Sequence, residues 1–141
     1  MTIKAVKAII LVNKNYLLQL RDRKKNISFP NHWGLFGGRI DKKEKNTIAL
    51  KREIKEETNL NIKINRRVFN VDFDIIGLKK KRNLQYYECE IIGKKKIKLS
   101  EGKKYKFFSF QQIKKLNIVP MDFVALKSHY LHNNHFISIY R

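Results

Sequence analysis

The stretch that decides the fold runs from Gly38 to Leu60 and reads GRIDKKEKNTIALKREIKEETNL. It gathers acidic side chains in a chain that has few of them, because only 12 Asp and Glu stand against 32 Lys and Arg. Five of those acids fall within this stretch: Asp41, Glu44, Glu53, Glu56 and Glu57. This concentration of scarce negative charge predicts a site for a cation.

Most of the acidic cluster is predicted to lie on a helix from about Thr47 to Thr58. Asn46 and Thr47 are residue types that cap the N-terminus of a helix, and Asn59 tolerates the left-handed conformation that ends one. The apolar residues of this helix are expected to pack inward: Ile48, Leu50 and Ile54.

Three glutamates of this helix share one face. Glu53, Glu56 and Glu57 are spaced i, i+3 and i+4, so their carboxylates lie close together and repel each other without a partner. A hard divalent cation prefers oxygen ligands and readily shares its coordination shell with substrate phosphates. Gly37 and Gly38 allow the backbone to approach closely, so that a carbonyl can add to the shell. The pattern therefore favours a metal site.

A solvated Glu/Lys-rich helix is the alternative explanation for this segment. Lys51 and Lys55 would then offset the glutamates as near neighbours. The fixed spacing of Glu44 and Gly38 upstream, in a strand-loop-helix context, favours the metal site.

The whole pattern resembles the Nudix box, G-x5-E-x7-R-E-U-x-E-E-x-G-U, in which U is a bulky aliphatic residue. Six of its seven fixed positions match, at Gly38, Glu44, Arg52, Glu53, Glu56 and Glu57, and both aliphatic positions match, at Ile54 and Leu60. Asn59 replaces the last glycine and is interpreted as a conservative helix stop. The lead-in from Trp33 to Gly38 is also similar to that of the family, with Phe36 where many members have proline.

The resemblance implies an α/β fold, a Nudix-type α/β/α sandwich with a mixed β-sheet, over a single domain spanning residues 1–141. Length and 43% apolar content are compatible with one domain. The implied activity is metal-dependent hydrolysis of the diphosphate bond of a nucleoside diphosphate linked to another group. The implied cofactor is Mg²⁺, with Mn²⁺ as a substitute, and the expected substrate is a small nucleotide such as a nucleoside triphosphate or nucleotide sugar.

By position in the motif, Glu56 and Glu57 are expected to be metal ligands, with the Gly38 carbonyl as a further ligand. Glu53 is expected to be another ligand or the base that activates water, and it ranks ahead of Glu57 as the base. Arg52 and Glu44 are expected to orient the loop and the catalytic carboxylates.

Four residues outside the helix are candidates for contact with substrate. Gly37 and Trp33 belong to the glycine-containing lead-in, and His32 lies at its mouth. Glu101 precedes a glycine in a later loop, from which it could reach the metal site, or it is an ordinary solvated carboxylate. Aromatic faces can stack on a nucleobase, but most of the remaining candidates are expected to be core: Phe36, Tyr86, Tyr87 and Phe107.

The rest of the chain supplies alternating or apolar segments that predict strands. The expected strands are Ile3–Val12, Tyr16–Leu20, Phe69–Ile75, Leu84–Ile92 and Tyr105–Phe110. A basic turn is expected at Lys79–Arg82, a short helical segment at Gln111–Leu116, and a terminal helix with Pro120 in its first turn. Three histidines near the C-terminus are expected to lie on the surface: His129, His132 and His135.

The net charge and the composition of the chain indicate which kinds of partner it can bind. The net charge of +20 predicts a field that attracts phosphates and nucleotides, although a solvated lysine-rich surface explains most of it. It leaves open processing of RNA 5′ ends, or RNA binding with a vestigial box, as well as a basic scaffold without activity. The lone Cys89 and the short apolar run Ala8–Val12 favour a cytoplasmic protein without a membrane segment. Oligomeric state is left open.

Overall fold

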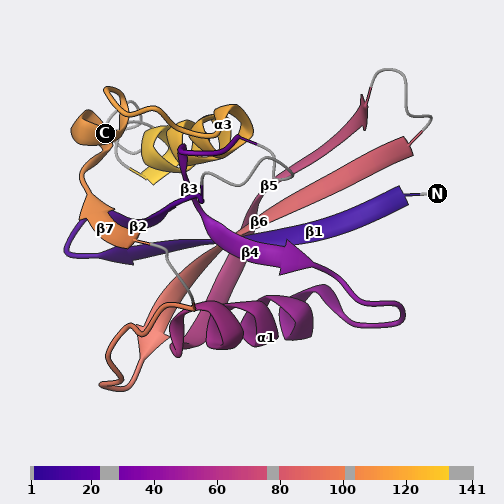
Figure 1. Ribbon diagram of the computed structural model, residues 1–141, viewed down its shortest axis with the longest axis horizontal. Helices are drawn as coiled ribbons and strands as arrows, with labels where there is room; N and C mark the ends of the chain where they lie inside the picture. Colours follow the sequence, from indigo (N-terminus) through magenta and orange to yellow (C-terminus); the bar gives the residue numbers. More distant parts are fainter. Residues whose placement is uncertain (1, 23–28, 76–79, 101–103, 134–141) are drawn as a thin grey trace.

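The computed structural model describes residues 2–22, 29–75, 80–100 and 104–133 (Figure 1). The elements in chain order are β1 (Thr2–Val12), β2 (Asn15–Leu20), β3 (Trp33–Gly34), β4 (Phe36–Arg39), α1 (Asn46–Thr58), β5 (Asn61–Ile75), β6 (Lys80–Ile92), β7 (Lys104–Phe108), α2 (Phe110–Ile113) and α3 (Pro120–Leu131).

Over these ranges the strands form one seven-stranded mixed sheet. The central pair, β1 and β6, is parallel, with Lys7 opposite Tyr86. The other pairings, β1 with β2 and β4, β2 with β3 and β7, and β5 with β6, are antiparallel. Helix α1 covers one face of the sheet and α3 lies on the other, which confirms the predicted α/β/α sandwich with a mixed sheet (Figure 1).

Alternation along β1 assigns its side chains to the two faces, because successive side chains of a strand point in opposite directions. Val6 and Ala8 belong to the core cluster that includes Leu50 of α1. Ile9 belongs to the second cluster, with Leu126 of α3. Both clusters consist of buried apolar side chains, and burial of this kind is the main stabilising contribution in folding.

The end of helix α1 was predicted correctly and its start lies one residue before the predicted Thr47, but the predicted capping residue is wrong. Asn59 has φ 67° and its N–H donates to the carbonyl of Lys55, as expected of a left-handed stop. The N-cap is Lys45, which makes no side-chain capping bond. The side chain of Asn46 instead donates to Gln85 Oε1 at 2.7 Å, so a tertiary contact has taken the group that was expected to cap the helix.

One residue of the predicted apolar face of α1 is exposed. Leu50 and Ile54 are buried, but 54% of Ile48 is exposed. Ile48 precedes Leu50 by two residues, which is about 200° around a helix with 3.6 residues per turn. It therefore lies on the solvent side.

The later elements correct two expectations. Lys80, Lys81 and Arg82 of the predicted basic turn already belong to β6, while Lys79 lies outside the described residues. Strand β7 ends at Phe108, because the Ser109 side chain accepts from the Gln112 N–H and starts α2.

The histidines of the C-terminal region differ from one another. His129 is fully buried, so its predicted surface position is wrong. Its Nδ1 lies 2.9 Å from Tyr16 Oη and its Nε2 lies 2.8 Å from Glu88 Oε1. His132 is exposed as expected, and His135 lies outside the described residues.

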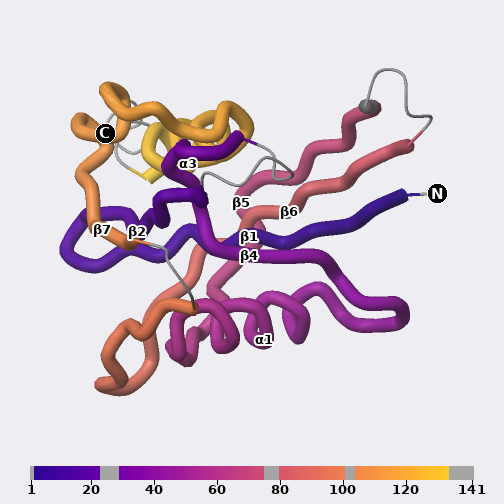
Figure 2. Tube along the Cα trace, in the orientation of Figure 1, coloured from indigo at the N-terminus to yellow at the C-terminus, as the bar shows by residue number. Residues whose placement is uncertain are grey.

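The beginning of α3 is fixed to the glycine-containing lead-in. Pro120 occupies the first turn of α3, as predicted. The Val119 N–H donates to the Trp33 carbonyl at 2.9 Å, and Trp33 also bridges to Ile118, so β3 lies beside the start of α3 (Figure 2). No helix of the described part of the chain is long and apolar enough to cross a membrane.

Candidate active site

Arg52 is the centre of the charged network on α1. Its Nε donates to Glu44 Oε2 at 2.8 Å and its Nη2 donates to Glu44 Oε1 at 2.9 Å, a two-pronged contact that suits the planar guanidinium. Its Nη1 lies 3.0 Å from Glu53 Oε1 and 3.4 Å from Glu56 Oε2. One arginine thus connects the loop before the helix with two carboxylates of the helix.

Glu44 fixes that loop. Besides Arg52, its Oε1 accepts from the Asp41 N–H at 3.0 Å. The Arg52 hydrogen bonds, followed by that of the Asp41 backbone, hold the pKa of Glu44 at about 2, so it stays charged at neutral pH. The bonds to Glu44 in turn raise the pKa of Arg52. Arg52 and Glu44 therefore contact each other, the loop backbone and Glu53, while their predicted role in orienting catalytic groups stays a prediction.

The side chain of Glu53 packs against strand β4 at Gly38. Its side chain is 16% exposed, and a Cβ on Gly38 would collide with its carboxylate. Burial raises the pKa of Glu53, the neighbouring charges of Glu56 and Glu57 raise it further, and Arg52 opposes them. Glycine at position 38 is thus what lets this carboxylate lie directly on the backbone of β4.

The carboxylate oxygens of α1 are of the type that a hard cation prefers, although they do not converge on one point in the structure. Among the described residues, no three side chains of His, Cys, Asp or Glu lie close enough together to hold a metal ion. Glu53 and Glu56 both direct an oxygen to Arg52. Nevertheless, the Glu53 carboxylate is destabilised by burial and by the neighbouring carboxylates, and it lies on backbone that only glycine leaves open. Mg²⁺ and Mn²⁺ prefer oxygen donors in such an environment.

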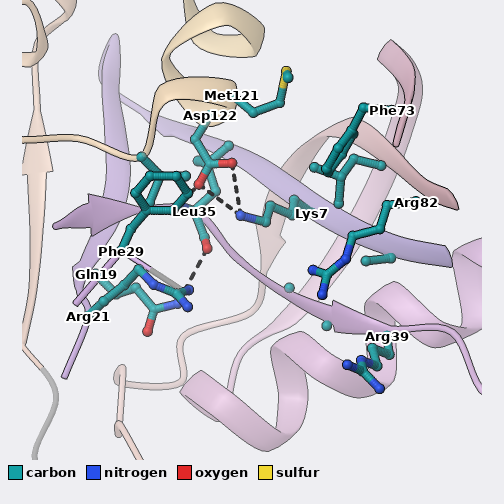
Figure 3. A pocket seen from close by; sticks show the side chains of 15 residues that line it. Lys7, Gln19, Arg21, Phe29, Leu35, Arg39, Phe73, Arg82, Met121 and Asp122 are labelled. Carbon is teal, nitrogen blue, oxygen red and sulfur yellow. Dashed lines mark hydrogen bonds and ion pairs between the residues drawn. The ribbon is translucent and has the colours of Figure 1, made fainter. Parts of the chain in front are cut away.

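A cavity of about 570 Å³ adjoins this network on the α3 side of the sheet (Figure 3). Its wall includes Gly37, Gly38 and Arg39, which connect it to the acidic site. Its other basic residues are Lys7, Arg21 and Arg82, and its apolar residues include Phe29, Phe73, Leu84 and Met121. A volume of this size is in the range of small-molecule sites.

Asp122 lies at the α3 side of the cavity and is fully buried. Lys7 Nζ donates to its two oxygens at 2.8 and 3.0 Å. Tyr86 Oη donates to Oδ1 at 2.7 Å, and the Leu35 N–H donates to Oδ2 at 2.9 Å. Burial and the Asp122 charge raise the pKa of Tyr86, so Tyr86 remains a donor.

Of the residues expected to contact substrate, some line the cavity and others do not. Gly37 lines the cavity, and a Cβ there would collide with the Val6 carbonyl. Trp33 does not line it and instead packs edge-on against Phe108, with ring centroids 4.8 Å apart. His32 contacts the cavity residue Phe29 edge-on at 5.6 Å.

The remaining candidates among the described residues do not line the cavity. Glu101 is outside the described residues, while Glu57 lies beside Ser100, whose Oγ is 3.5 Å from Glu57 Oε2. The aromatic residues Phe36, Tyr86 and Tyr87 are buried, as expected for core residues.

Sequence reasoning missed the residues that shape the cavity, above all Lys7 and Asp122. They are 115 residues apart in the chain. A signal was present at each position, since Lys7 interrupts the otherwise apolar run from Ala5 to Val12, and Asp122 is the acid of the first turn of α3. A charged residue on an otherwise buried surface requires a partner.

The fold and the carboxylate network define the class of protein, and the comparisons agree with it. The family model of the NUDIX domain matches residues 1–127, so the chain belongs to the Nudix family. Family membership makes the protein a pyrophosphohydrolase that acts on nucleoside diphosphate derivatives, in a family that generally uses divalent metals.

Solved structures of the family resemble it over most of its length. A MutT protein from Methanosarcina mazei Go1 is 23% identical, with a TM-score of 0.76 over 95% of this chain and 96% of that one. A MutT protein from methicillin-resistant Staphylococcus aureus 252 is 28% identical, with a TM-score of 0.71 over 90% and 94%. A Nudix hydrolase from Nitrosomonas europaea is 15% identical, with a TM-score of 0.77 over 94% and 90%. No curated protein matches the chain significantly.

Proposed function

We propose that the protein is a Mg²⁺-dependent hydrolase, with Mn²⁺ as a substitute, that cleaves the diphosphate bond of a small nucleotide by attack of water on phosphorus. Nucleoside triphosphates and nucleotide sugars are the substrate classes that we favour. The single domain spanning residues 1–141 would carry the whole activity, in the cytoplasm.

The observation that carries this proposal is the continuity between the acidic network and the cavity. Gly38 contacts Glu53 on one side and lines the cavity on the other. A diphosphate next to Gly38 would therefore lie between the carboxylates of α1 and the wall of the cavity, with room for the nucleoside in the cavity. Arg39 would neutralise phosphate charge at the entrance.

The glutamates of α1 have different roles, as ligands of the cation or as the base. We assign Glu56 and Glu57 as ligands of the cation, with the Gly38 carbonyl as a further ligand, and Glu53 as the base or a further ligand. A cation held there would supply charge neutralisation and would acidify bound water. Glu53 accepts a proton more readily than an ordinary carboxylate because its pKa is raised. Arg52 holds Glu53 and Glu56 in position and is itself fixed by Glu44.

The test is hydrolysis of a panel of nucleoside triphosphates, nucleotide sugars, dinucleoside polyphosphates and 5′-triphosphate RNA, with release of phosphate or pyrophosphate as the readout. We expect turnover of a small nucleotide with Mg²⁺ or Mn²⁺, none with excess chelator, and a large loss in Glu56→Gln. The exposed Glu90 of β6 provides the matched control, Glu90→Gln, which should retain activity. Turnover in chelator, or full activity in Glu56→Gln, would overturn the assignment.

The alternative substrate is the 5′ end of RNA, which the net charge of +20 favours. If RNA is the substrate, its affinity should fall steeply with added salt, because phosphate contacts release counterions. Processing of RNA in the panel without turnover of small nucleotides would replace the first proposal with this one.

A further inference from the structure

The carboxylate of Asp122 has no acceptor capacity left for a ligand. An ionised carboxylate offers about four lone-pair sites on its two oxygens. Oδ1 accepts from Lys7 and Tyr86, and Oδ2 accepts from Lys7 and the Leu35 N–H. Although Asp122 borders the cavity, its charge and its lone pairs are already used within the protein.

Lys7 is the member of this pair that faces the cavity. The Asp122 side chain is fully buried, whereas that of Lys7 is 16% exposed. Lys7 and Asp122 point toward one another at the edge of the cavity (Figure 3). An ammonium group has three N–H donors, and two suffice for the contacts with Asp122. The pair thus presents a donor, not an acceptor, to a bound molecule.

The rest of the polar wall adds further hydrogen-bonding groups. Arg82 lies opposite Phe73 in the β5/β6 pair, so both side chains lie on the face of the sheet that borders the cavity. Among the described residues, two buried side-chain atoms lack a hydrogen-bond partner: Arg82 Nε and Gln19 Oε1. Both belong to residues that line the cavity. One is a donor, and the other is an acceptor.

We infer that Lys7 determines base specificity, and that the cavity selects a nucleobase with a carbonyl group at position 4 of a pyrimidine or position 6 of a purine, as in uracil, guanine and hypoxanthine, over the counterpart with an amino group at that position. This inference rests on the proposed function, because it assigns the nucleoside moiety to the cavity. A carbonyl group at this position can accept from the Lys7 ammonium. If an amino group replaces the carbonyl, its N–H donors face the N–H donors of Lys7, and Lys7 has no acceptor in the base.

The test uses two pairs of nucleotides that differ only at this group and at the proton of the adjacent ring nitrogen, ITP with ATP and UTP with CTP. The wild-type protein should have the higher kcat/KM for the carbonyl member of each pair, by about tenfold or more, as expected for a hydrogen bond to a charged group. In Lys7→Met the Asp122 carboxylate is released and can accept from an amino group, so the preference should vanish or reverse. Lys63→Met removes an exposed lysine from β5 and should leave the ratios unchanged.

A second variant guards against loss of folding in Lys7→Met. The double substitution Lys7→Met/Asp122→Asn removes both charges together, so no unpaired charge is buried. Its ratio within each pair should approach one. Equal kcat/KM values within each pair for the wild-type protein, or unchanged ratios in a folded Lys7 variant, would overturn the inference.

Binding separates failure of this inference from failure of the proposed hydrolysis. Calorimetric affinities for IMP and AMP, and for UMP and CMP, are measured in chelator, where hydrolysis plays no part. A carbonyl preference that depends on Lys7 supports the inference even if no nucleotide is hydrolysed, in which case only the hydrolysis proposal fails. Absence of binding by all four monophosphates together with absence of turnover would overturn both.

Discussion

The two faces of the sheet carry charge in different ways. On the α1 face, Arg52 joins Glu44, Glu53 and Glu56 in a network that solvent still reaches, since the side chains of Arg52 and Glu56 are 29% and 59% exposed. On the α3 face, Lys7 pairs with a fully buried Asp122. In the first network the Glu53 carboxylate is destabilised by burial beside a glycine, and in the second network all acceptor sites of the Asp122 carboxylate are occupied. In our proposal, the α1 face performs the chemistry, whereas the α3 face holds and selects the nucleoside.

The largest expected effect comes from Glu53 on the α1 face. In Glu53→Gln we expect kcat to fall by about 10²–10⁴-fold, the range for removal of a general base. Because burial raises the pKa of Glu53, a neutral side chain of the same shape should not lower the free energy of unfolding. Steady-state kinetics and thermal unfolding measure the two quantities, with Glu90→Gln as the control. An active Glu53→Gln protein would show that the base lies elsewhere.

The next effect compares removal of one cation from each face. Lys7→Met leaves the buried charge of Asp122 without its ion pair and should lower the free energy of unfolding by about 3–5 kcal/mol. Arg52→Met affects more exposed pairs and should cost about 1 kcal/mol. Denaturant unfolding of both variants measures the difference. Equal losses would contradict the distinction between a solvated and a buried network.

A smaller effect tests the contact between β4 and α1. Gly38→Ala places a methyl group against the Glu53 carboxylate, which should displace it and reduce kcat by about a hundredfold, as for misplaced catalytic groups in general. The same change should also destabilise the fold. In a Glu53→Ala background the collision is absent, so Gly38→Ala should then cost little stability, and unfolding of the four proteins measures this coupling. Equal costs in both backgrounds would show that Gly38 does not serve Glu53.

The smallest effect concerns His129, which anchors α3 by contacts with Tyr16 and Glu88. Burial lowers the pKa of His129 below its usual 6.5, despite the opposing contact with Glu88. The folded protein therefore binds fewer protons than the unfolded chain, and stability should fall as the pH drops below 6.5 toward the lowered value. In His129→Gln this slope between pH 7 and 5 should flatten, whereas in His132→Gln, an exposed position, it should persist. An unchanged slope in His129→Gln would assign the pH dependence to another group.

The α1 face was predictable from the sequence because its residues are close in the chain. Gly38, Glu44 and Arg52 lie within one strand-loop-helix unit, so their spacing alone determines that they meet. Asn59 was predictable for a similar reason, since the left-handed conformation is a local property of the residue.

The α3 face was not predictable in this way. Lys7 meets Asp122 only because β1 and α3 pack together, and the Asn46 side chain prefers Gln85 over the helix end only because β6 lies beside it. His129 gave no periodic signal that distinguished burial from exposure. Single charged residues within apolar segments, such as Lys7, mark where such long-range partners are required.

The most direct test of the division between the faces is the steady-state kinetics of Glu53→Gln and Lys7→Met/Asp122→Asn on the best nucleotide of the panel. If the account holds, the first variant loses kcat and retains the wild-type ratio between carbonyl-bearing and amino-bearing bases. The second retains most of kcat at saturation, has a raised KM, and loses that ratio. The opposite assignment, with base selection lost in Glu53→Gln and kcat lost in the Lys7/Asp122 variant, would contradict it.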